Sequence, residues 1–282
     1  MNLFDLHADT PLIFEDKNKK SAVDMLNHPF EKYIQTFAVF IREDDKNGYL
    51  TFKNRLNDIE QFSAKNSIPI VTDKLHSGIL LSVENAIFLA DDINLIYNLY
   101  NASVKMISLC WNNDNPLASG ANGSGGITPL GEKVIGLMNK LGIALDISHL
   151  SHKAAIQGID LANKVLATHS NVFDLHPHPR NLKRDALLKL KQKGGIVGIC
   201  FYPQFLGGGD VFCRIKAQLD YLVSLGMQNN ISIGTDFDGA DMAPTLCKTK
   251  QIYDLYIYLQ NEGFEKPFLE RIFYKNAIDF FS

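Results

Sequence analysis

Two residues near the start of the sequence can bind a metal ion together. His7 and Asp9 end a short apolar segment in residues 4–10, which read FDLHADT. Residues two positions apart on a β-strand point to the same face, so both side chains are expected on one side. An imidazole nitrogen beside a carboxylate oxygen can chelate a divalent ion such as zinc. A single His-x-Asp pattern is more often the polar end of a strand than a metal site. The metal-site interpretation therefore depends on residues elsewhere in the sequence.

Further residues of the same types occur where later apolar segments end. These residues are Glu84, His149, His169, Asp236 and Asp238. Each follows a short run rich in Val, Ile, Leu or Ala. If they converge, the imidazoles and carboxylates would be desolvated and would repel one another without cations between them. The pattern therefore favours metal ions at a shared site.

The elements that would position these residues alternate along the chain. Short apolar runs bounded by Gly, Asn or Ser predict strands, and amphipathic stretches between them predict helices. The expected strands are 2–6, 36–41, 78–83, 105–109, 143–146, 165–167, 195–199 and 231–234. The expected helices are 54–65, 92–102, 130–141, 151–162, 184–192, 213–225 and 268–280.

Eight strands alternating with helices predict a (β/α)8 TIM-type barrel, with residues 1–282 forming a single domain. A doubly wound open sheet is the alternative, but no G-x-G-x-x-G motif follows an early strand. In a barrel the carboxyl ends of all strands meet at one mouth, where the chemistry of this fold takes place. The long polar stretch 112–126 is expected to be a functional loop.

The number of candidate ligands favours two metal ions. His7, Asp9 and Glu84 would make one set, and His149 and His169 with a shared Glu84 would make the other. Such ions lie about 3.5–4 Å apart, and water held between them would be hydroxide near neutral pH. That hydroxide could attack a carbonyl group. Asp236 would remain as a general acid/base or as a partner for a cationic substrate group.

Arg180 lies in a proline-stiffened segment just beyond the sixth strand, in residues 176–182, HPHPRNL. An arginine near a metal site is suited to bidentate binding of a substrate carboxylate. A surface arginine paired with Asp174 or Asp185 is an equally good interpretation of the spacing.

The composition argues against several classes of partner. The net charge is −3 and no basic stripe occurs, so neither nucleic acid nor an anionic membrane is expected to bind. The four cysteines form no C-x-x-C pair, which suits a reducing cytosol. No signal peptide or membrane span is expected, so the prediction is a cytoplasmic protein.

Several motifs in order along the chain resemble the membrane (renal-type) dipeptidases, zinc metallopeptidases of the amidohydrolase-like barrels. The motifs are 5–11 DLHADTP, 82–84 SVE, 126–131 GITPLG, 145–151 LDISHLS, 168–171 THSN, 178–182 HPRNL, 194–198 GGIVG and 234–239 GTDFDG. The resemblance implies a barrel with two Zn²⁺ ions that hydrolyses dipeptides, some with a D-residue at the C-terminal position. Relatives often form homodimers, so a homodimer is a further expectation.

The resemblance also implies roles for individual residues. His7 and Asp9 would bind one zinc ion, His149 and His169 the second, and Glu84 would bridge the two. Arg180 would hold the C-terminal carboxylate of the substrate, and Tyr202 would contact the substrate. Asp236 would act as acid/base near the substrate amine.

The chain departs from the family pattern in three respects. Trp111 stands where animal members carry a histidine that steadies the tetrahedral intermediate, so that help would come from zinc alone or from another donor. Asn85 and Ala86 replace the more usual glycine pair after Glu84, which is expected to reshape the pocket wall. We also expect a protein shorter than most relatives, without the secretory and anchor segments of the animal enzymes.

Two alternatives to a dipeptidase stay open. One is another amidohydrolase, acting on N-acyl amino acids, lactones or cyclic amides. Phosphotriesterase-like members use a lysine after the fourth strand and deaminase-like members use His-x-His after the first, and neither pattern occurs here. The other alternative is a binding protein without turnover, for which Trp111 is the only support.

Overall fold

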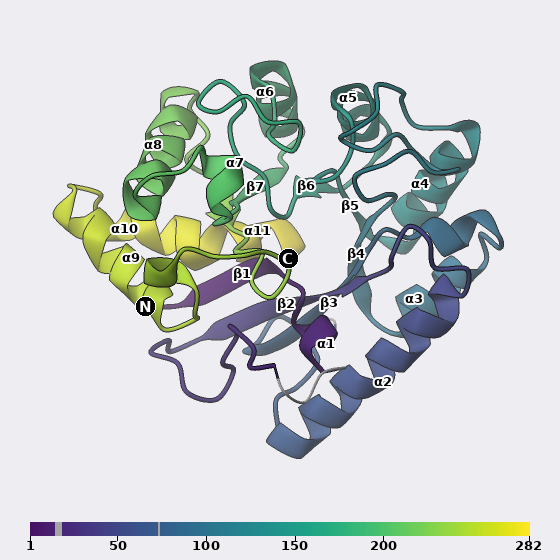
Figure 1. Cartoon of the computed structure of the whole chain (residues 1–282), viewed down its shortest axis with the longest axis horizontal. Helices are drawn as coiled ribbons and strands as arrows, with labels where there is room; N and C mark the ends of the chain where they lie inside the picture. Colours follow the sequence, from purple (N-terminus) through teal and green to yellow (C-terminus); the bar gives the residue numbers. More distant parts are fainter. Residues whose placement is uncertain (15–18, 73) are drawn as a thin grey trace.

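Eight parallel strands form a closed barrel in the order of the sequence, and β8 pairs with β1. The structure is a computed structural model that describes residues 1–14, 19–72 and 74–282. Figure 1 shows the helices arranged around these strands. The strands are β1 (Leu3–Ala8), β2 (Tyr33–Phe40), β3 (Gly78–Glu84), β4 (Val104–Ser108), β5 (Ala144–Asp146), β6 (Val165–Ala167), β7 (Ile196–Ile199) and β8 (Ile231–Ile233). The predicted (β/α)8 barrel is confirmed, and the open-sheet alternative is wrong.

The helices follow the predicted alternation, with differences at several boundaries. They are α1 (Thr10–Ile13), α2 (Gly48–Asn66), α3 (Leu95–Asn101), α4 (Pro129–Leu141), α5 (His152–Leu161), α6 (Arg184–Gln192), α7 (Pro203–Leu206), α8 (Val211–Ser224), α9 (Gln251–Asn261), α10 (Lys266–Glu270) and α11 (Asn276–Phe281). Short helical turns η1 (Ile87–Ala90), η2 (Pro244–Leu246) and η3 (Arg271–Lys275) complete the set. The helix expected over 268–280 is divided by the π-helical turn η3, and α2 begins six residues before its predicted start.

Polar side chains cap the starts of α4 and α5. The Thr128 hydroxyl accepts a hydrogen bond from the Gly131 N–H at the start of α4, and Ser151 does the same for Ala154 at the start of α5. Each cap satisfies a backbone donor that has no partner within the helix. The helix α4 precedes β5 and α5 follows it, so the two helices fix the segment that carries His149.

Apolar side chains fill the barrel and support its mouth. Buried residues from seven consecutive strands form one cluster, which also includes Ala277 of α11: Phe4, Leu6, Ile34, Leu80, Met106, Ala144, Leu166 and Ile196. A second, larger cluster packs the outer faces of the strands against the helices. Strands buried on both faces explain the nearly continuous apolar runs in the sequence. Within the described ranges, no helix combines the length and the apolar character needed to cross a membrane.

Candidate metal centre and active site

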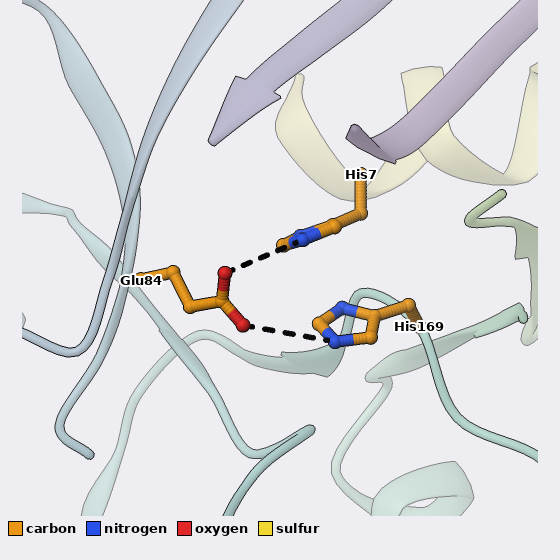
Figure 2. A group of neighbouring side chains, drawn as sticks. All are labelled: His7, Glu84 and His169. Atoms are coloured by element: carbon orange, nitrogen blue, oxygen red, sulfur yellow. Dashed lines mark ion pairs between the residues drawn. The ribbon is translucent and has the colours of Figure 1, made fainter. Parts of the chain in front are cut away.

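Glu84, the last residue of β3, faces three imidazoles with its two carboxylate oxygens. Its Oε2 atom is 3.7 Å from Nε2 of His7, and its Oε1 atom is 2.5 Å from Nε2 of His149 and 3.9 Å from Nε2 of His169. Figure 2 shows one carboxylate oxygen of Glu84 pointing toward His7 and the other toward His169, and the centroids of those two rings lie 3.8 Å apart. All four side chains are at most 5% exposed. One buried carboxylate therefore presents one oxygen to His7 and the other to His149 and His169.

His7 also approaches two further carboxylates. Its Nε2 atom is 3.4 Å from Oδ2 of Asp9 and 3.9 Å from Oδ1 of Asp236. His7, Asp9 and Asp236 each offer a ligand atom within 4.8 Å of the others, as do His7, Glu84 and His169. The structure thus brings together five strand ends that are far apart in the sequence.

Asp9 reaches His7 in a way that the strand pattern did not predict. β1 ends at Ala8, and Asp9 lies in the turn that begins α1, with φ −87° and ψ 28°. The pairing of β1 with β2 also shifts between Asp5 and Ala8, as in a β-bulge. The expectation that His7 and Asp9 share one face of a strand is therefore wrong. A bulge and a turn bring the two side chains together.

The hydrogen bonds of His169 fix which nitrogen carries its proton. The hydroxyl of Thr168 donates to Oδ2 of Asp146 at 2.5 Å and lies 2.8 Å from Nδ1 of His169. Because that hydroxyl has only one proton, Nδ1 of His169 must donate to it. The Nε2 atom of His169 is then left with a free lone pair, as a metal ligand requires.

His149 is oriented in the same sense by the long loop after β4. Its Nδ1 atom lies 3.0 Å from Oδ1 of Asn112, an acceptor, so Nδ1 donates and Nε2 carries the lone pair. Burial, followed by the nearby positive charges of Arg180 and His7, lowers the pKa of both imidazoles well below the usual range. Both rings are therefore neutral, and their Nε2 atoms lie 2.9 Å apart. Two lone pairs facing each other at this distance fit a shared cation.

The acidic groups of the site also fit bound cations. Burial and the neighbouring carboxylates raise the pKa of Asp9 to about 6 and that of Asp236 to about 7. Burial lowers the pKa of His7, but the adjacent Asp9, Glu84 and Asp236 outweigh it and raise that pKa to about 10. Nε2 of His7 and Oδ1 of Asp9 are buried, and neither atom has a hydrogen-bond partner of suitable geometry among the residues that the structure describes. Unsatisfied buried ligand atoms beside excess negative charge are the surroundings in which a divalent ion is stable.

Arg180 is buried and directed at the same centre. It is 4% exposed, and its Nη2 atom lies 3.1 Å from Nε2 of His149. The surface-pairing alternative is wrong, because Asp174 accepts a hydrogen bond from Tyr221 and Asp185 pairs with His152. The Nε and Nη1 atoms of Arg180 have no partner within the described part of the chain. The guanidinium thus has donors available for an anionic ligand.

A cavity of about 560 Å³ opens over these residues at the mouth of the barrel. Its lining includes Asp9, Glu84, His149, His169, Arg180, Tyr202 and Asp236. Tyr202 is half-buried, and its ring centroid lies 4.9 Å from that of Phe205. Every residue that the sequence singled out for this site, except the almost fully enclosed His7, therefore lines one cavity.

Asp238 and the two residues that follow Glu84, Asn85 and Ala86, have structural roles. The Asp238 carboxylate accepts hydrogen bonds from Thr10, Ser21 and the Ala22 N–H, and so ties the start of the chain to the end of β8. Asn85 has φ 65° and donates from its side chain to the Ile41 carbonyl. Neither Asn85 nor Ala86 lines the cavity, so the expected effect on the pocket wall is wrong.

Sequence reasoning missed several residues that the structure brings to the site. Phe205 lies 5.3 Å from the Arg180 guanidinium, and His178 accepts a hydrogen bond from the Arg180 N–H and lines the cavity. The two prolines around His178 were the only signal in the sequence. Thr168 and Asn112 adjoin predicted features, but their hydrogen bonds depend on side-chain geometry that spacing does not encode.

The profile of the membrane dipeptidases, peptidase family M19, matches residues 1–281. The chain belongs to this family. Among curated M19 relatives, an uncharacterized dipeptidase of Schizosaccharomyces pombe is 27% identical over 213 residues, which are 72% of this chain and 52% of that protein. A dipeptidase of Claviceps purpurea is 26% identical over 168 residues, covering 57% of this chain and 40% of that protein. The chain thus spans about half the length of these relatives.

Solved structures of M19 proteins share the fold over the whole chain. The structure of dipeptidase AC, a metallopeptidase of family M19, matches with a TM-score of 0.90 and 18% identity, covering 100% of this chain and 98% of that one. A metallopeptidase from Rhodobacter sphaeroides, liganded with a phosphinate mimic of the dipeptide L-Ala-D-Ala, matches with a TM-score of 0.84 and 19% identity, covering the same shares of both chains. At such identities the likeness concerns the fold.

Proposed function

We propose that this M19 family member is a dipeptidase that uses two divalent metal ions, zinc in the first instance. The observation that supports the proposal is the position of Glu84, whose Oε2 atom faces His7 while its Oε1 atom faces His149 and His169. A carboxylate shared between two sets of ligands is the usual centre of a two-metal hydrolase.

The residues divide into two ligand sets. His7 and Asp9 would hold one ion, His149 and His169 the other, and Glu84 would contribute one oxygen to each. Bound divalent ions polarise a carbonyl oxygen and lower the pKa of water, which supplies the means of hydrolysing an amide. Asn112 and Thr168 keep the Nε2 lone pairs of His149 and His169 available.

The chain's own charged groups suit the two ends of a dipeptide. A free dipeptide carries a carboxylate and an ammonium group a few ångströms apart. The unpaired guanidinium donors of Arg180 would bind the carboxylate, and Asp236 would accept the ammonium group and exchange a proton with the reacting nitrogen. Tyr202 lines the cavity beside Asp236 and would contact the substrate.

Acceptance of a D-residue at the C-terminal position is part of the proposal. Its support is the Rhodobacter sphaeroides relative, whose ligand mimics L-Ala-D-Ala. The proposal extends this stereochemistry to the present chain, in which Arg180 would fix the carboxylate and leave the side chain free to differ in hand.

The test compares metal-depleted and zinc-restored protein on a matched set of substrates. The set contains L,L and L,D dipeptides and their N-acetyl derivatives, which keep the carboxylate but lack the ammonium group. We expect hydrolysis of free dipeptides by the protein that holds two zinc ions, and at least ~10²-fold less by the depleted protein. Preferential hydrolysis of the N-acetyl compounds would instead favour the N-acyl amino acid alternative. Tight binding without any turnover at full metal loading would favour the binding protein.

A further inference from the structure

Two aromatic side chains form one wall of the cavity. Phe40 is the last residue of β2 and Trp111 follows β4, and their ring centroids lie 5.3 Å apart with an interplanar angle of 62°. Both are half-buried and both line the cavity, and the Trp111 ring centroid is 6.0 Å from that of His149. We call Phe40 and Trp111 the aromatic wall.

The Trp111 ring of the aromatic wall faces that of His149, but none of the described polar groups of the site forms a hydrogen bond with the wall. Within residues 1–14, 19–72 and 74–282, the indole N–H of Trp111 has no hydrogen-bond partner. Phe205, which also lines the cavity, differs from these two residues. Its ring covers the Arg180 guanidinium, and its ring centroid lies 4.6 Å from that of His178. The half-buried rings of Phe40 and Trp111 therefore present apolar surface to the cavity. Such surface is stabilised when an apolar group displaces water from it.

The barrel order shows that this wall and the groups proposed to bind the ends of a dipeptide reach the mouth from opposite strands. In a closed barrel of eight strands, β2 lies opposite β6 and β4 lies opposite β8. Arg180 comes from the segment after β6, and Asp236 from the segment after β8. Other strands than those of Arg180 and Asp236 thus supply the aromatic wall. A dipeptide that these two residues hold by its carboxylate and ammonium groups still has its side chains free to contact the wall.

We infer that the aromatic wall is a specificity-determining subsite that binds a large apolar side chain of the substrate, so that dipeptides containing Leu or Phe are preferred over those of Gly and Ala. The inference rests on the proposed dipeptidase function. Differences in apolar contact within one pocket typically change specificity by about 10–200-fold. Trp111 then shapes the substrate side of the pocket rather than donating a hydrogen bond in the reaction.

The chain contains a single tryptophan, so its fluorescence reports on this wall directly. Zinc-loaded protein is titrated with phosphinate dipeptide mimics that carry either Ala or Leu side chains, in one series at the N-terminal position and in another at the C-terminal position. We expect a saturable change in Trp111 emission and, in at least one series, a Kd at least ~10-fold lower for Leu than for Ala. Equal affinities in both series would overturn the inference.

Substitutions then test the same wall by hydrolysis. The measured quantity is the ratio of kcat/KM for a Leu-containing dipeptide to that for its Ala counterpart. We expect Trp111→Ala and Phe40→Ala each to lower this ratio by ~10-fold, and Trp111→Phe, which keeps an aromatic ring without the N–H, to retain most of it. The control Tyr100→Ala removes an aromatic side chain that is 50% exposed on α3 and should leave the ratio unchanged.

The possible failures are distinguishable. If Trp111→Ala and Trp111→Phe lower kcat/KM equally for large and small substrates, Trp111 acts in the reaction and the subsite is wrong. If dipeptides are hydrolysed without preference for large apolar side chains, the subsite fails and the proposed function stands. If no dipeptide is hydrolysed, the proposed function fails, while the fluorescence titration still measures whether the wall binds apolar side chains.

Discussion

The Nε2 atoms of His149 and His169 lie 2.9 Å apart. Each ring donates a hydrogen bond from its Nδ1 atom, His149 to Asn112 and His169 to Thr168. Neither Nε2 atom can donate to the other, because both protons are placed on Nδ1. Oε1 of Glu84 approaches from one side and the Arg180 guanidinium from another. The pair is therefore arranged as metal ligands in advance of binding.

Glu84→Gln should weaken both metal sites at once. The amide keeps the size of the side chain but removes the charge shared between His7 and His149. We expect zinc content to fall below one ion per chain and dipeptide hydrolysis to fall by at least ~10², since even loss of an outer hydrogen-bond partner costs 10–100-fold. Metal analysis after gel filtration and kcat/KM measure the two effects. Glu132→Gln, an exposed residue on α4, is the matched control, and loss of only one ion with full activity would contradict the shared role.

Thr168→Val should act through His169 without touching a ligand. Valine has nearly the shape of threonine but cannot accept the proton on Nδ1 of His169 or donate to Asp146. We expect zinc affinity to fall by about 10–100-fold, as for other outer-sphere partners of metal-binding histidines. A competitive chelator titration measures the affinity. Thr168→Ser, which keeps the hydroxyl, should behave like the native protein, and equal losses in both variants would point to packing instead.

The sequence was sufficient to predict which residues meet. A parallel barrel gathers the carboxyl ends of its strands, so Glu84, His149, His169 and Asp236 could be assigned to one mouth from strand positions alone. The helix α9 was also within reach, because its buried residues Ile252, Leu255, Tyr256 and Leu259 have helical spacing, but it was not predicted.

The details around those residues could not be predicted from spacing. The approach of Asp9 depends on a bulge and a turn, and the role of Asp238 depends on contacts more than 200 residues away in the sequence. The Thr168 hydroxyl acts through its orientation, which the positions of neighbouring residues do not determine. Phe40 is one apolar residue in an apolar strand, and only the closed barrel places it beside Trp111.

Arg180→Gln should lower the hydrolysis of substrates that have a free C-terminal carboxylate. Glutamine cannot provide the charged donors that Arg180 directs into the cavity. A hydrogen bond to a charged group contributes about 1.5–3 kcal/mol, so we expect kcat/KM for dipeptides to fall by about 10–150-fold. Dipeptide amides, which lack the carboxylate, should be poor substrates for the native protein and change little in the variant. An equal fall for acids and amides would show that Arg180 acts on the metal ligands instead.

The stability of the metal-free protein should decrease as the pH rises from about 7 to about 10. The folded-state pKa of His7 is raised to about 10, so folding stabilises its protonated form, and that stabilisation is lost as pH rises through this range. The raised pKa values of Asp9 and Asp236 act in the same direction below pH 7, where the lowered pKa values of His149 and His169 oppose them. Melting temperatures at pH 7, 8, 9 and 10 measure the effect. Each kcal/mol lost from the free energy of unfolding should lower the melting temperature by about 2–4 °C. Zinc-loaded protein is the control and should show a flatter profile over this range, because the metal takes the place of the proton on His7. A metal-free protein whose melting temperature rises between pH 7 and 10 would contradict the charge balance described for the site.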